Sequence, residues 1–172
     1  MASHRIFLSR PTTLSVAQER FCTALGRLFV AYRLDPHTVG TQDFTHRSPL
    51  GKVLEVMNTC DGACILGMVQ ARASEAVIKP STPAERSLTD VVFASPWNQL
   101  EAGMALIRGL PLFIICEAGV SGGVFDDGVA DAYIHRLPPR GREKWIERTA
   151  FVESLKAWID DMNRALPRGR ER

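Results

Sequence analysis

The sequence predicts one α/β domain, with a parallel sheet between layers of helices. Two continuous apolar runs, ACILGMV (residues 63–69) and LPLFIIC (residues 110–116), are typical of strands buried on both faces. Segments with helical spacing of apolar residues alternate with such runs along the chain, which is the order of elements in a parallel sheet. The length of 172 residues, of which 45% are hydrophobic, suits one globular domain with a sizeable core.

Charge and composition argue against nucleic acid and membrane as partners. The formal net charge is +2, and part of the surplus lies in the final stretch RALPRGRER rather than in a basic stripe interleaved with aromatic residues. No segment reaches the roughly 18 unbroken apolar residues of a membrane helix, and the N-terminal apolar run is too short for a secretory signal. We expect a cytoplasmic protein with one domain over residues 1–166 and a basic, disordered tail over residues 167–172.

The cysteines are expected to be reduced core thiols. They stand in apolar neighbourhoods, and their spacing matches neither CxxC nor a zinc-like Cys/His cluster. The four are Cys22, Cys60, Cys64 and Cys116.

The first half of the chain begins with a strand and a helix. RIFLS (residues 5–9) stops before Pro11, as a strand entering a loop does, and residues 15–32 have helical spacing. The apolar positions of this helix are Val16, Phe21, Leu25, Leu28 and Phe29. Residues 35–48 are expected to form a short extended piece and a polar loop. Pro49 then opens a helix with one apolar face, formed by Leu50, Val53, Leu54 and Met57.

The second half is expected to contain a long irregular loop, two helices and two strands. Residues 70–94 show no sustained period, so they either cover a site or form a plain insertion. Ser95 is a good N-cap and Pro96 suits the first position of a helix that ends near Gly109. The predicted buried stripe of that helix is Trp97, Leu100, Met104 and Ile107. A strand at 110–116, a Gly/Asp-rich loop at 117–128, a strand at 132–137 and a long amphipathic helix at 144–166 follow.

The carboxyl ends of the strands are the expected place of a ligand site, since loops and helix N-termini converge there in open parallel sheets. Ser9 and Arg10, the first turn of the Ser95 helix and the 117–128 loop should meet at this edge. Glu101, four residues after Trp97, lies on nearly the same helix face and borders the apolar stripe. Such a carboxylate can stabilise an oxocarbenium-like centre, bind ribose hydroxyls or attack as a nucleophile. The alternative is an ordinary amphipathic helix with a Glu at its edge.

Other polar residues are weaker candidates. Asn98 and Gln99 either donate to a ligand or are solvated turn residues, and Asp43 and His46 belong to a loop that is either solvated or a contact surface. Gly122 and Gly123, which precede Asp126 and Asp127, either permit close approach of a ligand or form an ordinary turn. His135 is interpreted as structural.

The absence of GxGxxG, GxxxxGK[ST] and GxSxG motifs argues against a Rossmann dehydrogenase, a P-loop ATPase and an α/β-hydrolase.

Several segments together resemble the Toll/interleukin-1 receptor (TIR) domain and its relatives, the nucleoside 2-deoxyribosyltransferase-like proteins. RIFLSRP is similar to the first TIR strand, and residues 40–67 are similar to the family's second connecting loop, helix and third strand. SPWNQLE resembles the helix in which Trp precedes the catalytic Glu by four residues. The insertion at 70–94 is longer than in ordinary TIR domains, and the Trp-Cys pair of many TIR enzymes is absent. EAGMALIRGLP is instead similar to the deoxyribosyltransferase-like pattern.

The resemblance implies a flavodoxin-like, three-layer fold and a nucleotide-sugar site with the ribose near Glu101. In catalytic TIR proteins the glutamate assists cleavage of the nicotinamide–ribose bond of NAD. NAD is therefore expected as the substrate, and a separate cofactor is not expected. Carried over by position, Glu101 is the catalytic residue, and no metal ligand is implied. The substrate-binding candidates are Phe7, Ser9, Arg10, Asp43, Trp97 and Asn98.

Three functions follow as hypotheses. The first is a TIR-like enzyme that cleaves the glycosidic bond of NAD or a related nucleotide and generates a nucleotide signal in bacterial anti-phage defence. The second is a nucleoside 2-deoxyribosyltransferase-like hydrolase or transferase, and the third is a non-catalytic nucleotide sensor or assembly module. The expected partners are therefore a nucleotide or nucleoside and, because many TIR enzymes act only when assembled, a second copy or another TIR-like domain.

Overall fold

A computed structural model describes residues 3–39 and 49–165 of the chain. The strands of the main sheet are β1 (His4–Ser9), β2 (Leu34–His37), β3 (Gly62–Gly67), β6 (Leu112–Glu117) and β7 (Ile134–Leu137). The helices are α1 (Val16–Ala31), α2 (Pro49–Met57), α3 (Pro96–Ile107), α4 (Arg142–Trp145) and α5 (Thr149–Ala165), with a 3-10 turn, η1 (Gly123–Phe125). Two further strands, β4 (Ala71–Ile78) and β5 (Arg86–Phe93), form a separate antiparallel hairpin.

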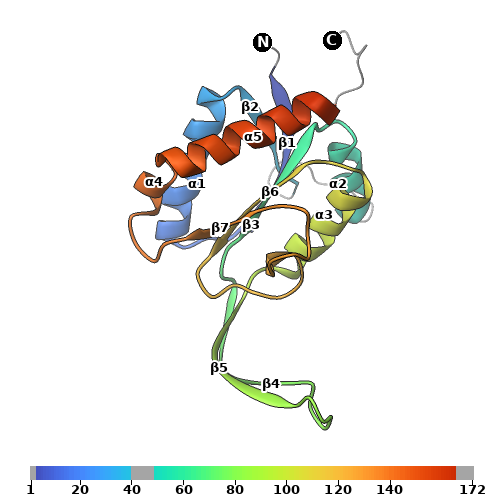
Figure 1. Ribbon diagram of the computed structural model, residues 1–172, viewed down its shortest axis with the longest axis vertical. Helices are drawn as coiled ribbons and strands as arrows, with labels where there is room; N and C mark the ends of the chain where they lie inside the picture. The colour runs from blue at the N-terminus through green and yellow to red at the C-terminus, as the bar shows by residue number, and fades with distance from the viewer. Residues whose placement is uncertain (1–2, 40–48, 166–172) are drawn as a thin grey trace.

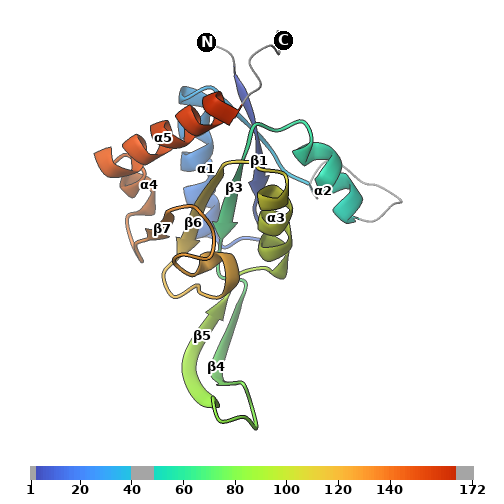
Figure 2. The ribbon, with the colours of Figure 1, turned by 45° about the vertical axis from the view of Figure 1, so that its right-hand side comes forward.

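The main sheet is parallel throughout and has the strand order β2-β1-β3-β6-β7. Counting only these five strands along the chain gives 2-1-3-4-5, which is the flavodoxin-like order. Helices α1, α4 and α5 lie on one side of this sheet and α2 and α3 on the other (Figures 1 and 2). The predicted α/β class with three layers is therefore confirmed.

Two apolar clusters, one on each face of the sheet, hold the layers together. The strands alternate their side chains between the faces, so Ile6 packs towards α1 and α5 while Phe7 packs towards α2 and α3. The first cluster includes Phe21, Leu25 and Phe29 of α1 and Leu155, Trp158 and Met162 of α5. The second includes Val53 and Met57 of α2 and Ala102 and Ala105 of α3. β3, at the centre, is buried along its whole length, as its apolar run predicts.

The irregular loop predicted over residues 70–94 is wrong, because β4 and β5 pair there as a regular hairpin. Most of its side chains are exposed on both faces, and so the strands lack the one-sided burial that produces an apolar/polar alternation. Figures 1 and 2 show the hairpin extending away from the rest of the domain at the end where β3 runs out. It leaves the sheet beside the loops in which the candidate site is expected.

The buried face of α3 also differs from the prediction. Trp97, Leu100 and Ile107 are exposed, and the buried residues are Asn98, Glu101, Ala102 and Ala105. Small side chains face the sheet because they allow the helix to approach β1 and β3 closely, and the large apolar residues are left at its outer edges. The helix caps agree with the prediction: the Ser95 hydroxyl accepts a hydrogen bond from the Trp97 N–H, and Gly109 has a φ of 68° just after the last turn.

Smaller differences concern the other helices. The C-terminal helix is interrupted after Trp145 and resumes at Thr149, and so the predicted single helix is two helices. Val16 in α1 and Leu50 and Leu54 in α2 are exposed, although their spacing places them on the apolar face.

The four cysteines are free and buried, as expected. No helix within residues 3–39 and 49–165 has the length and apolar character needed to cross a membrane.

Candidate functional site

The candidate site lies where the chain leaves β1 and β3 at their carboxyl ends. In the sheet, β1 has β2 on one side and β3, β6 and β7 on the other. In an open parallel sheet, a crevice forms between the carboxyl ends of two neighbouring strands when the connections that follow these strands cover opposite faces of the sheet. Ser9 ends β1 and pairs with Ile65 of β3. The next residues, Arg10 and Pro11, enter the loop towards α1.

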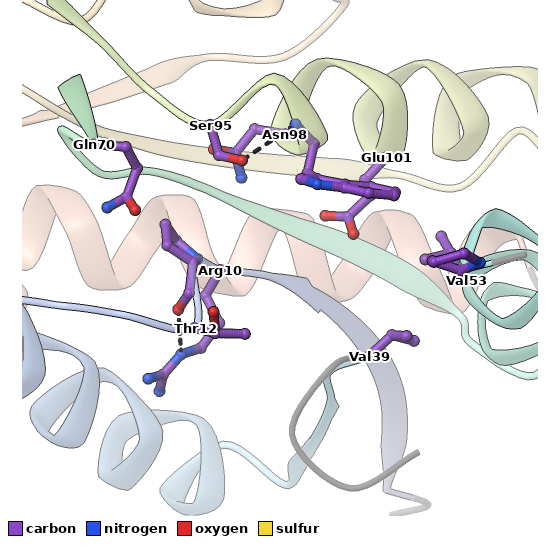
Figure 3. A pocket seen from close by; sticks show the side chains of 11 residues that line it. Arg10, Thr12, Val39, Val53, Gln70, Ser95, Asn98 and Glu101 are labelled. Atoms are coloured by element: carbon purple, nitrogen blue, oxygen red, sulfur yellow. Dashed lines mark hydrogen bonds between the residues drawn. The ribbon is translucent and has the colours of Figure 1, made fainter. Parts of the chain in front are cut away.

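A cavity of about 250 Å³ occupies this crevice. Its lining comes from five segments of the chain: the β1–α1 turn, the end of β2, α2, the base of the hairpin and the first turns of α3. The lining residues are Arg10, Pro11, Thr12, Val39, Pro49, Val53, Gln70, Ser95, Trp97, Asn98 and Glu101. Figure 3 shows Glu101 pointing from α3 into the space above Thr12 and Val39, with Val53 of α2 at one side. The sequence prediction that the β1 end and the start of α3 meet is confirmed.

Asn98 connects α3 to the end of β1. Its side-chain nitrogen Nδ2 donates to the Ser9 hydroxyl over 2.7 Å, and both residues are 1% exposed. The interpretation of Asn98 as a solvated turn residue is therefore wrong. Its carbonyl oxygen Oδ1 is buried and has no hydrogen-bond partner among the described residues. An unpaired buried acceptor is unfavourable by about 1–3 kcal/mol, so this oxygen is a candidate acceptor for a hydrogen bond from a bound ligand.

Glu101 lies one turn further along α3 and is 9% exposed. Burial raises the pKa of its carboxyl group above the usual value, and a hydrogen bond with the Ser9 hydroxyl opposes that rise. Because Ser9 accepts from Asn98, its own O–H proton is free to be donated to Glu101. Asn98, Ser9 and Glu101 therefore form one chain of hydrogen bonds that orients the carboxylate and favours its ionised form.

The cavity rim carries an aromatic side chain and a cation. Trp97 is 44% exposed, which leaves an indole face available to a ligand, whereas the sequence predicted that it is buried in the core. Arg10 lines the cavity, but its guanidinium turns towards α1, where Nη2 donates to Glu19 over 3.3 Å. Figure 3 shows this guanidinium pointing away from Glu101. Arg10 therefore contributes its chain to the wall, and its charge stays near the rim.

Phe7 and Ser9, two of the predicted substrate-binding residues, do not line the cavity. Phe7 is 1% exposed and belongs to the apolar cluster under α2 and α3, so it supports the floor of the crevice. Asp43, together with His46, falls outside the described residues. Ser9 is 1% exposed and acts on the cavity wall only through its hydrogen bonds with Asn98 and Glu101.

Gln99 tethers the loop after β6 rather than facing the cavity. Its Nε2 donates to the Gly122 carbonyl over 2.9 Å, and its Oε1 accepts from the Val124 N–H over 3.0 Å. Glycine is favoured at position 123, because its φ is 58° and an added Cβ atom would lie 2.3 Å from the Gln99 Oε1 and displace that side chain. Asp126 closes the turn by accepting from the Gly122 N–H. The glycine pair therefore forms a turn packed on α3, and this part of the 117–128 loop does not line the cavity.

Sequence reasoning missed a buried polar network at the end of β6. Glu117 is 6% exposed and accepts hydrogen bonds from the Val69 N–H over 2.6 Å and from Gln18 over 2.7 Å. Its other oxygen forms an ion pair with Arg142 of α4. The network joins β6, the end of β3, α1 and α4 on the side of the sheet away from α3. The sequence signal for it is a Glu that directly follows a continuous apolar strand.

His135 is structural, as the sequence suggests. It is buried among aromatic rings, with Phe113 at a centroid distance of 4.6 Å, and its Nε2 lies 3.0 Å from the Ser154 hydroxyl. Burial lowers the pKa of His135 to about 4, so it is neutral near pH 7. Within residues 3–39 and 49–165, no three His, Cys, Asp or Glu side chains come together as metal ligands do.

Comparison with models of protein families and with curated proteins gives no match to this sequence. The TIR-like resemblance therefore stays a hypothesis, and the residues of the crevice are the basis for a function. They combine a buried carboxylate, a hydroxyl and amide that orient it, and an exposed indole at the rim. Such a set can bind a polar, hydroxyl-bearing group and stabilise a positive charge that develops beside the carboxylate.

Proposed function

We propose that the protein cleaves the glycosidic bond of NAD or a related nucleotide, with Glu101 as the catalytic residue. The observation that supports this most is the burial of the Glu101 carboxylate in the wall of the crevice, with Ser9 and Asn98 behind it. Cleavage of a nicotinamide–ribose bond sends the bonding electrons to the ring nitrogen, and the sugar carbon becomes positive before water adds to it. A carboxylate near that carbon stabilises the developing charge.

Partial burial strengthens this effect. The interaction between Glu101 and a nearby positive centre is screened less in a crevice that excludes most water than in bulk solvent. The same burial penalises the ionised carboxylate, and the Ser9 hydroxyl offsets part of that penalty. The proposal therefore assigns Glu101 to the reacting sugar and makes Ser9 and Asn98 positioning residues.

The size and lining of the cavity suit one end of a nucleotide. Its volume of about 250 Å³ is smaller than the roughly 300–1,000 Å³ of pockets that enclose a whole drug-sized ligand. One sugar and its base would fill it, while the rest of a dinucleotide would extend over the rim. There the exposed Trp97 offers a face on which a ring can stack.

The test is incubation of the purified protein, at low and high concentration, with NAD and separately with a panel of deoxynucleosides. Chromatography and mass spectrometry would detect the released base. We expect nicotinamide release that falls by about 100-fold or more in Glu101→Gln, because a charged group acting in the transition state is lost. Glu153→Gln is the matched control, since Glu153 is an exposed residue of α5 on the opposite face of the sheet.

The other outcomes separate the alternatives. Release of bases from deoxynucleosides but not from NAD would favour the deoxyribosyltransferase-like reaction at the same glutamate. Binding of NAD without turnover, unchanged in Glu101→Gln, would reject the enzymatic proposal and favour a nucleotide sensor. Turnover that is equal in wild type and Glu101→Gln would place the reaction at another site.

A further inference from the structure

The hairpin of β4 and β5 is a structural element without a function in the candidate site. Each of its strands has eight residues, and strands of this length extend by about 26 Å. The only buried side chain of the two strands is Val92, close to the base. Apolar side chains are exposed along it, among them Val77 at 52% and Phe93 at 42%.

An isolated two-stranded hairpin is at best marginally stable in water. It becomes stable when further strands join it or when a helix covers one face. Within the described part of the chain no helix covers these strands, and the outer edges of both strands are unpaired. Unpaired edges are templates for pairing with another chain, so the hairpin is suited to strand addition.

The charges of the hairpin favour another copy of the chain as the added partner. Arg72, Lys79 and Arg86 balance Glu75, Glu85 and Asp90 in the sequence between residues 70 and 94. A neutral surface of this kind has no electrostatic attraction to nucleic acid or to an anionic membrane, both of which need an excess of basic residues. Balanced charges of both signs instead allow a surface to complement itself.

The order of the charges selects one edge and one register. Two identical antiparallel strands related by a two-fold axis perpendicular to their sheet must place one residue directly opposite its own copy. With Leu88 on the axis, Arg86 of each β5 lies opposite Asp90 of the other, and Ser87 lies opposite Thr89. On β4, Arg72 and Glu75 are separated by an odd number of positions, and therefore no such axis brings them opposite each other.

We propose that two copies of the protein associate through β5, edge to edge and antiparallel, with Leu88 on the two-fold axis. The two hairpins then form one four-stranded sheet. Within the described residues neither Arg86 nor Asp90 forms an ion pair in the single chain, so both charges are available. This interface is independent of the glycosidic reaction proposed for the crevice.

Asp90 is the residue at which the β5 backbone departs from the extended conformation. The ladder between the two strands pairs Ala73 with Val91 and Glu75 with Thr89 and omits the Ser74–Asp90 position between them. Asp90 has a φ of 52°, a left-handed conformation that Asp adopts more readily than most residues. Asp90 therefore has no ladder partner within its own hairpin.

Charge exchange tests the proposal in solution. Sedimentation velocity of the full chain over a wide concentration range should show a reversible monomer–dimer equilibrium. Arg86→Asp or Asp90→Arg alone should weaken the dimer by roughly tenfold or more, since each change creates two like-charge pairs. The double variant should restore association. Arg72→Asp is the matched control on the β4 edge and should leave the dimer unchanged.

A disulfide tests the register. Leu88→Cys should form an intermolecular disulfide under mild oxidation, because directly opposite residues bring their Cβ atoms within about 4.5–5.5 Å. Thr89→Cys should not, since residue 89 faces residue 87 of the other copy. The native cysteines are buried and do not compete. A monomer at every concentration overturns the proposal, as does a dimer that neither single charge change weakens; circular dichroism would confirm that each variant is folded.

Discussion

Asn98 of α3 donates from Nδ2 to the hydroxyl of Ser9, the last residue of β1, over 2.7 Å. This contact fixes the hydrogen-bonding directions around the candidate catalytic residue. A hydroxyl group has one proton, and because Ser9 accepts from Asn98 it keeps that proton for Glu101. The strand end, the helix and the carboxylate are therefore coupled through one oxygen atom.

Ser9→Ala should raise the pKa of Glu101 further. The Ser9 hydrogen bond favours the ionised carboxylate, and its removal leaves burial unopposed. If ionised Glu101 supports base release, the acidic limb of the pH–rate profile should move to higher pH. The reaction at high pH should be affected less than the reaction at low pH. A uniform loss at all pH values would show that Ser9 acts on packing instead; Ser15→Ala, at the N-cap of α1, is a control for general destabilisation.

Asn98→Asp should be more harmful than Asn98→Ala at neutral pH. Ala removes the buried acceptor that lacks a partner together with the donor to Ser9, whereas Asp places a second carboxylate close to Glu101 with no donor to Ser9. Like charges in one partly buried site disfavour each other's ionised forms. We expect Asn98→Ala to lower the free energy of unfolding by about 1–3 kcal/mol. Asn98→Asp should lower the free energy of unfolding more at pH 7 than at pH 4. Urea unfolding at both pH values measures the difference, and equal losses would contradict it.

The titration of Glu101 should make stability depend on pH. Its folded-state pKa is raised above the ordinary value of 4.5, so the folded protein holds this proton more tightly than the unfolded chain. The stabilisation that this tighter proton binding gives to the folded state is fully present below about pH 4.5. It is lost as the pH rises through the folded pKa of Glu101. Glu101→Gln has no such proton. The unfolding free energy of wild type minus that of Glu101→Gln should therefore fall between pH 4 and pH 8. A constant difference would show that the carboxyl group is not desolvated.

Breaking the ion pair between buried Glu117 and partly buried Arg142 should lower the free energy of unfolding. Arg142→Met leaves Glu117 with the Val69 N–H and Gln18 as donors but without a counter-charge. Loss of one member of a fully buried pair is unfavourable by about 3–5 kcal/mol. Because Arg142 is partly exposed, the loss should lie at or below the lower end of this range, and removal of both charges should be less unfavourable than the sum of the single losses. Chemical unfolding of Arg142→Met, Glu117→Gln and the double variant forms the cycle. Additive losses would mean that the two side chains do not interact.

The layers of the fold were predictable because they depend on one-sided or complete burial of apolar residues. β3 and β6 are continuous apolar runs, and the first strand and helix have clear periods. The hairpin was missed for the converse reason, since strands exposed on both faces have no alternating pattern. Its turn residues with positive φ, Lys79 and Ser81, are not glycines and gave no turn signal.

Within the site, Glu101 and its neighbourhood were predictable, but the face of α3 was not. A ranking by hydrophobicity places Trp97, Leu100 and Ile107 inside, whereas the buried residues of α3 are Asn98, Glu101, Ala102 and Ala105. Which face of the helix packs on the sheet depends on tertiary contacts and has no local signal. Asn98 and Gln99 show the same limit: adjacent polar residues in one turn have different partners, one on β1 and one on the loop after β6.

Gly67→Ala should disturb the packing between the sheet and η1. A Cβ atom at Gly67 would lie 2.5 Å from Cε1 of Phe125 and 2.8 Å from the Cβ of Cys116, and the second of these contacts involves the neighbouring strand β6. Overpacking of this kind lowers stability by about 1–3 kcal/mol. Gly26→Ala in α1 is the matched control, because nothing lies within 4 Å of its added Cβ and Ala is favoured over Gly in a helix by about 0.5–1 kcal/mol. Thermal unfolding should therefore show opposite signs for the same chemical change. A neutral Gly67→Ala would mean that both η1 and the neighbouring strand β6 shift freely to make room for the added methyl group.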